Sequence, residues 1–175
     1  VPLARTRRRS WLVALAALAI AGGAWRASPG AAELPSAFEA YMGAEKDAGE
    51  WLSGVAAPGE VVMDRKPPVA FYANRPYRVI PDRPYEEIVA FARRQGVRYL
   101  VLEEGVVRVF RPQLAPLLYD PAFRARERRL EMVYFGGHHR GYGVVIFRVL
   151  RPGEAPSGRP PAANLRWKRA AAPAP

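Results

Sequence analysis

The chain has 175 residues, a net charge of +11 and no cysteine. This length suits one domain with appendages, and the missing cysteines exclude thiolate catalysis and cysteine-ligated zinc. The charge does not indicate a nucleic-acid partner. Residues 1–9 and 151–175 each contribute +4, while residues 10–150 hold 18 basic and 15 acidic side chains, close to balance.

The N-terminal residues predict a segment directed to a membrane. Four arginines within residues 1–10 precede an uncharged run from Trp11 to Trp25, and basic residues placed in this way stay in the cytoplasm. As a helix the run reaches only about 22 Å, against roughly 30 Å of bilayer hydrocarbon. Two interpretations stay open. The segment is either a transmembrane anchor that continues through residues 27–32, or a secretory signal peptide cleaved near residues 22–24.

The body of the chain predicts helices that alternate with strands. Ser36 and Glu39 form a capping-box pattern that predicts the start of a helix, which ends before residues 58–59. Short strands are expected at residues 61–63 and 77–80, with a short helix between them that opens at paired prolines. The clearest helix covers residues 85–94, because its apolar positions recur at helical spacing and its charges suit the helix dipole.

The second half of the body predicts a central strand and a hairpin. Residues 97–102 are almost continuously apolar, which is typical of a buried strand. A short helix at residues 111–119 precedes two strands at 130–135 and 143–150. The fold class expected is therefore α/β. A small mixed sheet, parallel with an antiparallel C-terminal hairpin, is flanked by helices and preceded by one N-terminal membrane helix.

These elements define four segments of the chain. We expect a basic cytoplasmic segment at residues 1–10, a transmembrane helix or signal anchor at 11–32 and an extracytoplasmic α/β domain at 33–151. Residues 152–175 are rich in proline and alanine and lack apolar periodicity, which predicts a disordered tail.

One group of residues suggests a ligand site. Asp64, Arg65 and Lys66 follow the first strand, and ligands of open α/β sheets bind beyond the carboxyl ends of the strands. The two cations suit a phosphate group, and Tyr72 and Tyr77 are placed to stack on a sugar. The alternative is a salt-bridged surface turn.

Three further charged groups offer weaker evidence for a functional site. Glu103 and Glu104 are expected in solvent where a strand meets a helix or loop. The adjacent histidines 138 and 139 lack further ligands for a metal site. The basic run at residues 124–129 suits either a solvated loop or contact with anionic lipid headgroups.

Three segments together resemble a known family. They are residues 49–63, which contain GEWL and PGEVVM, residues 65–72 with RKP and VAFY, and residues 96–101, GVRYLV. They resemble the C-terminal extracytoplasmic domain of bacterial GT-C type membrane glycosyltransferases, which use polyprenyl-phosphate sugars and are related to protein mannosyltransferases and lipid A aminoarabinose transferases. The resemblance spans residues 11–150 and implies that the apolar run is a membrane anchor.

The same resemblance limits the function expected. The family's catalytic carboxylates lie in a loop between membrane helices, which has no counterpart here, so we assign no catalytic residue, cofactor or metal. The expected partners are the lipid bilayer and a polyprenyl-phosphate carrier lipid or other membrane helices. The expected function is that of a membrane-tethered binding or accessory domain that does not transfer sugar alone. An exported soluble binding protein with a cleaved signal peptide is the alternative.

Overall fold

The structure is a computed structural model that describes residues 29–137 and 142–165. The arginine cluster, the apolar run and the histidine pair lie outside the described residues. The chain divides into two compact units, residues 1–39 and residues 40–175, and the second is called the sheet-bearing unit below. Within the described ranges, none of the helices combines the length and hydropathy that a bilayer span requires.

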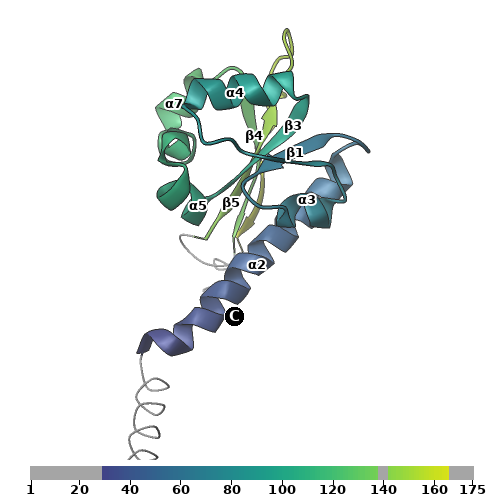
Figure 1. Cartoon of the computed structure of the whole chain (residues 1–175). Helices are drawn as coiled ribbons and strands as arrows, with labels where there is room; N and C mark the ends of the chain where they lie inside the picture. The colour runs from purple at the N-terminus through teal and green to yellow at the C-terminus, as the bar shows by residue number, and fades with distance from the viewer. Residues whose placement is uncertain (1–28, 138–141, 166–175) are drawn as a thin grey trace, which may run out of the picture. The chain divides into compact units, whose positions relative to one another are not determined.

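The sheet-bearing unit alternates helices and strands (Figure 1). Its described part holds one sheet of six strands in the order β2-β1-β3-β5-β4-β6. In chain order the described elements are α2 (Pro29–Val55), β1 (Val61–Asp64), α3 (Pro68–Ala73), β2 (Tyr77–Val79), α4 (Tyr85–Arg94), β3 (Val97–Glu103), α5 (Glu104–Phe110), η1 (Pro112–Leu114), α6 (Ala115–Tyr119), α7 (Pro121–Arg126), β4 (Leu130–Gly137), β5 (Val144–Val149) and β6 (Ala162–Leu165).

The sheet is mixed, as the sequence predicts. Strand β1 pairs in parallel with β2 and with β3, and β3 pairs antiparallel with β5. Strands β4 and β5 form the antiparallel C-terminal hairpin. The helices after β1 and β2 act as crossovers between parallel strands, which explains why the first half of the chain alternates strand and helix. The α/β class is confirmed, while the N-terminal membrane helix stays a prediction.

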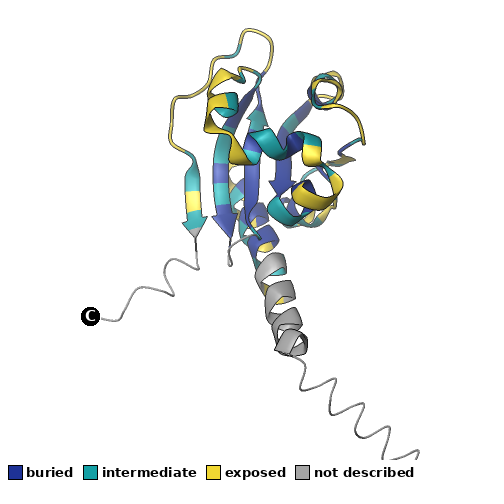
Figure 2. Ribbon diagram, turned by 90° about the vertical axis from the view of Figure 1, so that its left-hand side faces the viewer, coloured by how far each residue is buried: buried dark blue, intermediate teal, exposed yellow. Residues whose placement is uncertain are grey.

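Both faces of the sheet are covered, so the central strands are buried on both sides (Figure 2). In β3, Leu100 and Leu102 join the core cluster that includes residues of α4 and α5. Their neighbours Tyr99 and Val101 join the cluster that includes residues of α2 and α3. This alternation follows from the pleat of a strand, which turns successive side chains to opposite faces.

Helix α2 starts earlier than the capping-box pattern indicates. It begins at Pro29, so Ser36 lies inside the helix rather than at its N-cap. Proline is tolerated in the first turn of a helix, and residues 31–34, Ala-Ala-Glu-Leu, are strong helix formers. A local capping signal therefore does not set the boundary when the residues before it also favour the helix.

The segment expected to be a disordered tail contains a strand. Ala162–Leu165 forms β6, which pairs in parallel with β4 in a register that sets Tyr134 opposite Ala162. The free edge of β4 offers unpaired backbone groups, and a nearby extended segment satisfies them whatever its composition. Residue composition does not record such pairing.

Candidate functional site

The carboxyl ends of β1, β2 and β3 meet at one edge of the sheet, here called the carboxyl edge, because the three strands run parallel. Asp64 is the last residue of β1, and Glu103 is the last residue of β3. The loop of Arg65 and Lys66 follows Asp64 directly. The residues predicted for ligand binding are therefore positioned by β1 and by the segments that follow it.

Asp64 is buried at this edge beside Glu45 of α2. The Asp64 Oδ1 atom accepts the Arg65 backbone N–H at 2.6 Å, and neither carboxyl oxygen of Glu45 has a hydrogen-bond partner among the described residues. Burial raises the pKa of Glu45 to about 7, and the positive charge of Lys66 opposes this increase. Burial also holds the pKa of Asp64 well above its usual range. The hydrogen bond from the Arg65 N–H lowers this pKa in part, and the charge of Glu45 raises it further.

Glu103 is buried as well, so the expectation that it lies in solvent is wrong. It does stand at a helix entry, since α5 begins at Glu104. Strand alternation places Glu103 on the same face of the sheet as Tyr99 and Val101, which is the face toward α2. Burial raises its pKa to about 7. Within residues 29–137 and 142–165, no group of three acidic or histidine side chains is arranged to hold a metal ion.

Arg65 projects beyond the buried carboxyls onto an aromatic ring. Its guanidinium carbon lies 3.9 Å from the centroid of the Phe110 ring at the end of α5, and Arg65 forms no ion pair within the described part of the chain. The Tyr77 hydroxyl donates to the Arg65 carbonyl oxygen at 2.9 Å. The structure thus brings Arg65, Lys66 and Tyr77 together at the end of β1, and Arg65 does not form the alternative salt-bridged turn.

Tyr72 makes a ring contact within its own helix. It belongs to α3, and its ring meets that of Phe71 edge to face with centroids 5.5 Å apart. A Cβ atom at Gly49 of α2 would collide with the Cβ atom of Tyr72, which shows how closely α3 packs on α2 there. The side chain of Tyr72 therefore takes part in the packing of α3.

Exposed apolar side chains occur on β2 and α5, the two elements that end near Arg65. Val79 of β2 and Val109 and Phe110 of α5 are all exposed, with 65% of Val109 accessible to solvent. Arg111 holds α5 near β2, because its Nη2 donates to the Ile80 carbonyl oxygen at 3.4 Å. We call the group formed by Arg65, Val79, Val109 and Phe110 the edge patch.

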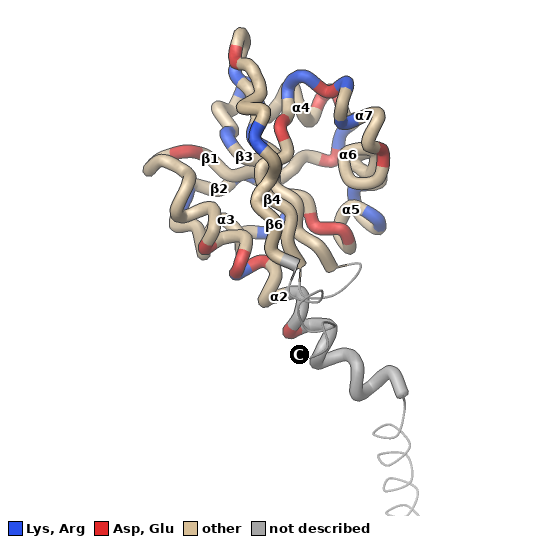
Figure 3. The backbone as a smooth tube through the Cα atoms, turned by 180° about the vertical axis from the view of Figure 1, so that it is seen from behind, with Lys and Arg blue, Asp and Glu red and all other residues tan. Residues whose placement is uncertain are grey.

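Cations and one exposed carboxylate lie near the edge patch, where Asp82 pairs with Arg111 at 3.4 Å. Arg78 and Arg108 are exposed beside Val79 and Val109, and Lys66 is exposed beside Arg65. Over the described part of the unit as a whole, basic and acidic side chains are interspersed (Figure 3). Apolar side chains next to cations are the combination that suits the headgroup boundary of an anionic bilayer.

The basic run at residues 124–129 is less available for contact with lipid headgroups than the sequence suggests. Its first half is helical, because α7 extends to Arg126. Arg124 donates to the carbonyl oxygens of Leu117 and Leu118 at 3.0 and 2.8 Å, and Arg129 pairs with Glu86 and Glu127. Two of its four arginines therefore make contacts within the protein.

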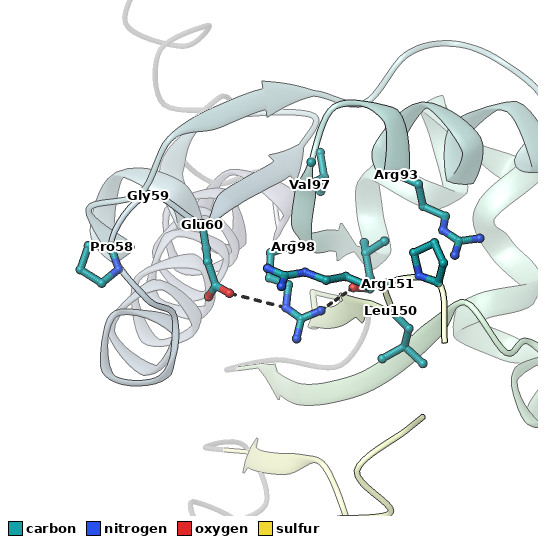
Figure 4. A pocket seen from close by; sticks show the side chains of 11 residues that line it. Pro58, Gly59, Glu60, Arg93, Val97, Arg98, Leu150 and Arg151 are labelled. Atoms are coloured by element: carbon teal, nitrogen blue, oxygen red, sulfur yellow. Dashed lines mark hydrogen bonds and ion pairs between the residues drawn. The ribbon is translucent and has the colours of Figure 1, made fainter. Parts of the chain in front are cut away.

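A pocket lies at the opposite edge of the parallel strands, where β1 and β3 begin (Figure 4). Its volume is about 400 Å³, and Arg93 of α4, Arg98 of β3 and Arg151 after β5 line it together with Glu60. Arg98 donates from Nη1 to the Val149 carbonyl oxygen at 2.9 Å. Two further bonds of 2.7 Å join Nη1 and Nη2 of Arg98 to the carboxylate of Glu154.

Two of these features were not predicted from the sequence. Glu45 falls three residues before Ala48 and seven before Leu52, both buried, so its helical position signals burial on the α2 stripe. The pocket has no such signal, since Arg98 and Glu154 are 56 residues apart and meet only in the folded chain.

Comparisons with protein-family models, with curated proteins and with solved structures gave no match to the chain. Function is therefore inferred from the arrangement of these residues and from the sequence resemblance.

Proposed function

We propose that the chain is a membrane-tethered extracytoplasmic domain of a polyprenyl-phosphate-dependent glycosyltransferase system. It binds the phosphate end of the carrier lipid at the carboxyl edge and does not transfer sugar alone. The observation that carries the proposal is the placement of the Arg65 guanidinium 3.9 Å over the exposed ring of Phe110, with Val109 exposed beside it.

A polyprenyl phosphate is an anion joined directly to an apolar chain. A guanidinium group binds phosphate through two parallel N–H donors, and it remains charged at any physiological pH. The edge patch offers this cation among apolar side chains, and Lys66 adds a second cation next along the chain. The phosphate and the first isoprene units of the lipid thus both find matching chemistry within the edge patch.

The path of the chain into the sheet-bearing unit also favours the carboxyl edge as the side that meets the membrane. Residue 40 opens the sheet-bearing unit, and five residues later Glu45 lies close enough to Asp64 to raise its pKa. The chain thus enters the unit beside the carboxyl end of β1. We propose that this end of the unit faces the bilayer, where the edge patch meets lipid.

The buried carboxyls do not suit catalysis in this proposal. Glu45, Asp64 and Glu103 are each at most 1% exposed, and burial raises the pKa of each of them. A substrate at the surface reaches none of them. We therefore assign them to the packing of α2 on the sheet, in line with a binding role for the chain.

Binding of farnesyl phosphate, a short polyprenyl phosphate, to the full chain in neutral detergent tests the proposal. We expect saturable binding that farnesol and inorganic phosphate do not reproduce, because the site needs both the charge and the apolar chain. Arg65→Gln should weaken it about tenfold, as expected for loss of a charged hydrogen-bonding group. Arg126→Gln, an exposed arginine on α7, is the matched control and should leave it unchanged.

Two results would contradict the proposal. Equal binding of farnesol would show that the phosphate is not recognised. Turnover of a polyprenyl-phosphate sugar by the purified chain would show that it is an enzyme in its own right.

A further inference from the structure

We propose that the pocket at the amino ends of β1 and β3 is a second binding site, which takes a small organic anion with one carboxylate or phosphate group on an apolar body. This inference goes beyond the proposed function, since the pocket lies at the edge of the sheet opposite the edge patch. It rests on the shape of the pocket, the fixed position of one arginine and the charge of two others.

The pocket is large enough for a small molecule. Its volume of about 400 Å³ falls within the roughly 300–1,000 Å³ typical of ligand pockets. Two glycine turns lead into its strands, Gly59 before β1 with φ +83° and Gly96 before β3 with φ +63°. A Cβ atom at either glycine would meet nothing within 4 Å, so the space beside both turns is open.

Arg98 is held in place by hydrogen bonds to the surrounding chain. Its hydrogen bonds to the Val149 carbonyl oxygen and the Glu154 carboxylate use three of its five N–H groups. The buried Nε–H group has no hydrogen-bond partner among the described residues, although Glu60 Oε1 lies 3.6 Å away. A guanidinium fixed in this way loses little side-chain entropy when it binds a ligand.

The other two arginines leave the pocket positively charged. Arg93 and Arg151 form no ion pair within residues 29–137 and 142–165, whereas Arg98 is paired with Glu154 and lies near Glu60. Three guanidinium groups against two carboxylates leave one net positive charge. In Figure 4 the side chains of Arg98 and Arg151 reach into the same part of the pocket, and Arg93 approaches from α4.

The remaining wall selects an organic anion over an inorganic one. Pro58 and Pro152 line the pocket with exposed apolar surface, while Val97 and Leu150 in its lining are buried. A bare phosphate ion leaves this apolar wall uncovered, while an aromatic or aliphatic body attached to the anionic group buries it. The arginine donors then fix the orientation of the ligand, as the few polar groups of a ligand pocket commonly do.

Calorimetric titration of the full chain in neutral detergent with phenyl phosphate, inorganic phosphate and benzyl alcohol tests this inference. Phenyl phosphate should bind saturably and more tightly than inorganic phosphate, and benzyl alcohol should not bind. Arg93→Gln and Arg151→Gln should each weaken phenyl phosphate binding about tenfold. Both side chains are exposed, so the variants should keep the melting temperature of the parent.

Two control variants distinguish binding in this pocket from binding at the edge patch. Arg126→Gln removes an equal charge from α7 and should not change phenyl phosphate binding. Arg65→Gln should also leave phenyl phosphate binding unchanged while it weakens farnesyl phosphate binding. The result for one proposed site therefore does not decide the result for the other. The inference is overturned if phenyl phosphate does not saturate, if both pocket variants bind it as tightly as the parent, or if benzyl alcohol binds equally well.

Discussion

Replacement of Glu45 by glutamine should stabilise the protein, and much more at pH 8 than at pH 5. Burial raises the pKa of Glu45 from 4.5 to about 7, so the folded chain holds this proton more tightly than the unfolded chain does. Between these two values the folded state binds more protons than the unfolded state. The contribution of Glu45 to stability therefore falls as the pH rises through this window and is smallest above pH 7.

The size of the effect follows from the shift. A difference of about 2.5 pKa units corresponds to roughly 3 kcal/mol at pH 8, and to under about 1 kcal/mol at pH 5. Glu45→Gln cannot ionise, so it removes this loss while it keeps the shape of the side chain. For a unit of this size, a change of 3 kcal/mol raises the melting temperature by roughly 10 °C.

Thermal unfolding of both proteins at pH 5 and at pH 8 measures the difference. Glu50→Gln is the matched control, because Glu50 is exposed on the same helix and pairs with Lys46 at 3.7 Å. Loss of the Glu45 charge also removes one cause of the raised pKa of Asp64, so both effects stabilise the variant at pH 8. The reasoning would be refuted if Glu45→Gln changed stability equally at the two pH values, or lowered it at pH 8.

Two further variants test the packing of α2 and the edge patch. Gly49→Ala should destabilise the protein by about 1–3 kcal/mol in urea unfolding, because the added methyl group would lie 2.8 Å from the Val69 carbonyl oxygen of α3. Gly54→Ala lies on the same helix with open space around it, so it should instead stabilise the protein by about 0.5–1 kcal/mol. Equal effects of the two changes would rule out the close contact between α2 and α3 at Gly49. Phe110→Ser should leave stability within about 0.5 kcal/mol yet weaken farnesyl phosphate binding; unchanged binding would remove this ring from the site.

The arrangement of the sheet was predictable because patterns within short segments of the sequence determine it. The nearly unbroken apolar run of β3 and the amphipathic α4 with its matching terminal charges are features of short segments, and each formed as expected. The mixed sheet followed from their order along the chain. The ends of elements were less predictable. The start of α2 depends on residues before its capping pattern, and β6 depends on the free edge of β4.

The candidate site was predictable in part for the same reason. Arg65 follows a strand, so the sequence alone placed it at the carboxyl edge. Its aromatic neighbour Phe110 is 45 positions further along the chain, and no spacing rule connects the two. Glu103 was misjudged because its position beside Glu104 suggested solvent, whereas the alternation of β3 turns its side chain under α2. Contacts between distant segments determine these outcomes.

The orientation of the sheet-bearing unit on a bilayer tests the central claim most directly. Because the chain has no cysteine, Val109→Cys and Arg94→Cys each give one site for a nitroxide label, on α5 at the carboxyl edge and at the far end of α4. With the full chain reconstituted in anionic vesicles, the label at position 109 should be broadened by a lipid-bound relaxing agent and the label at position 94 should not. Equal broadening at both positions, or broadening only at position 94, would contradict the account.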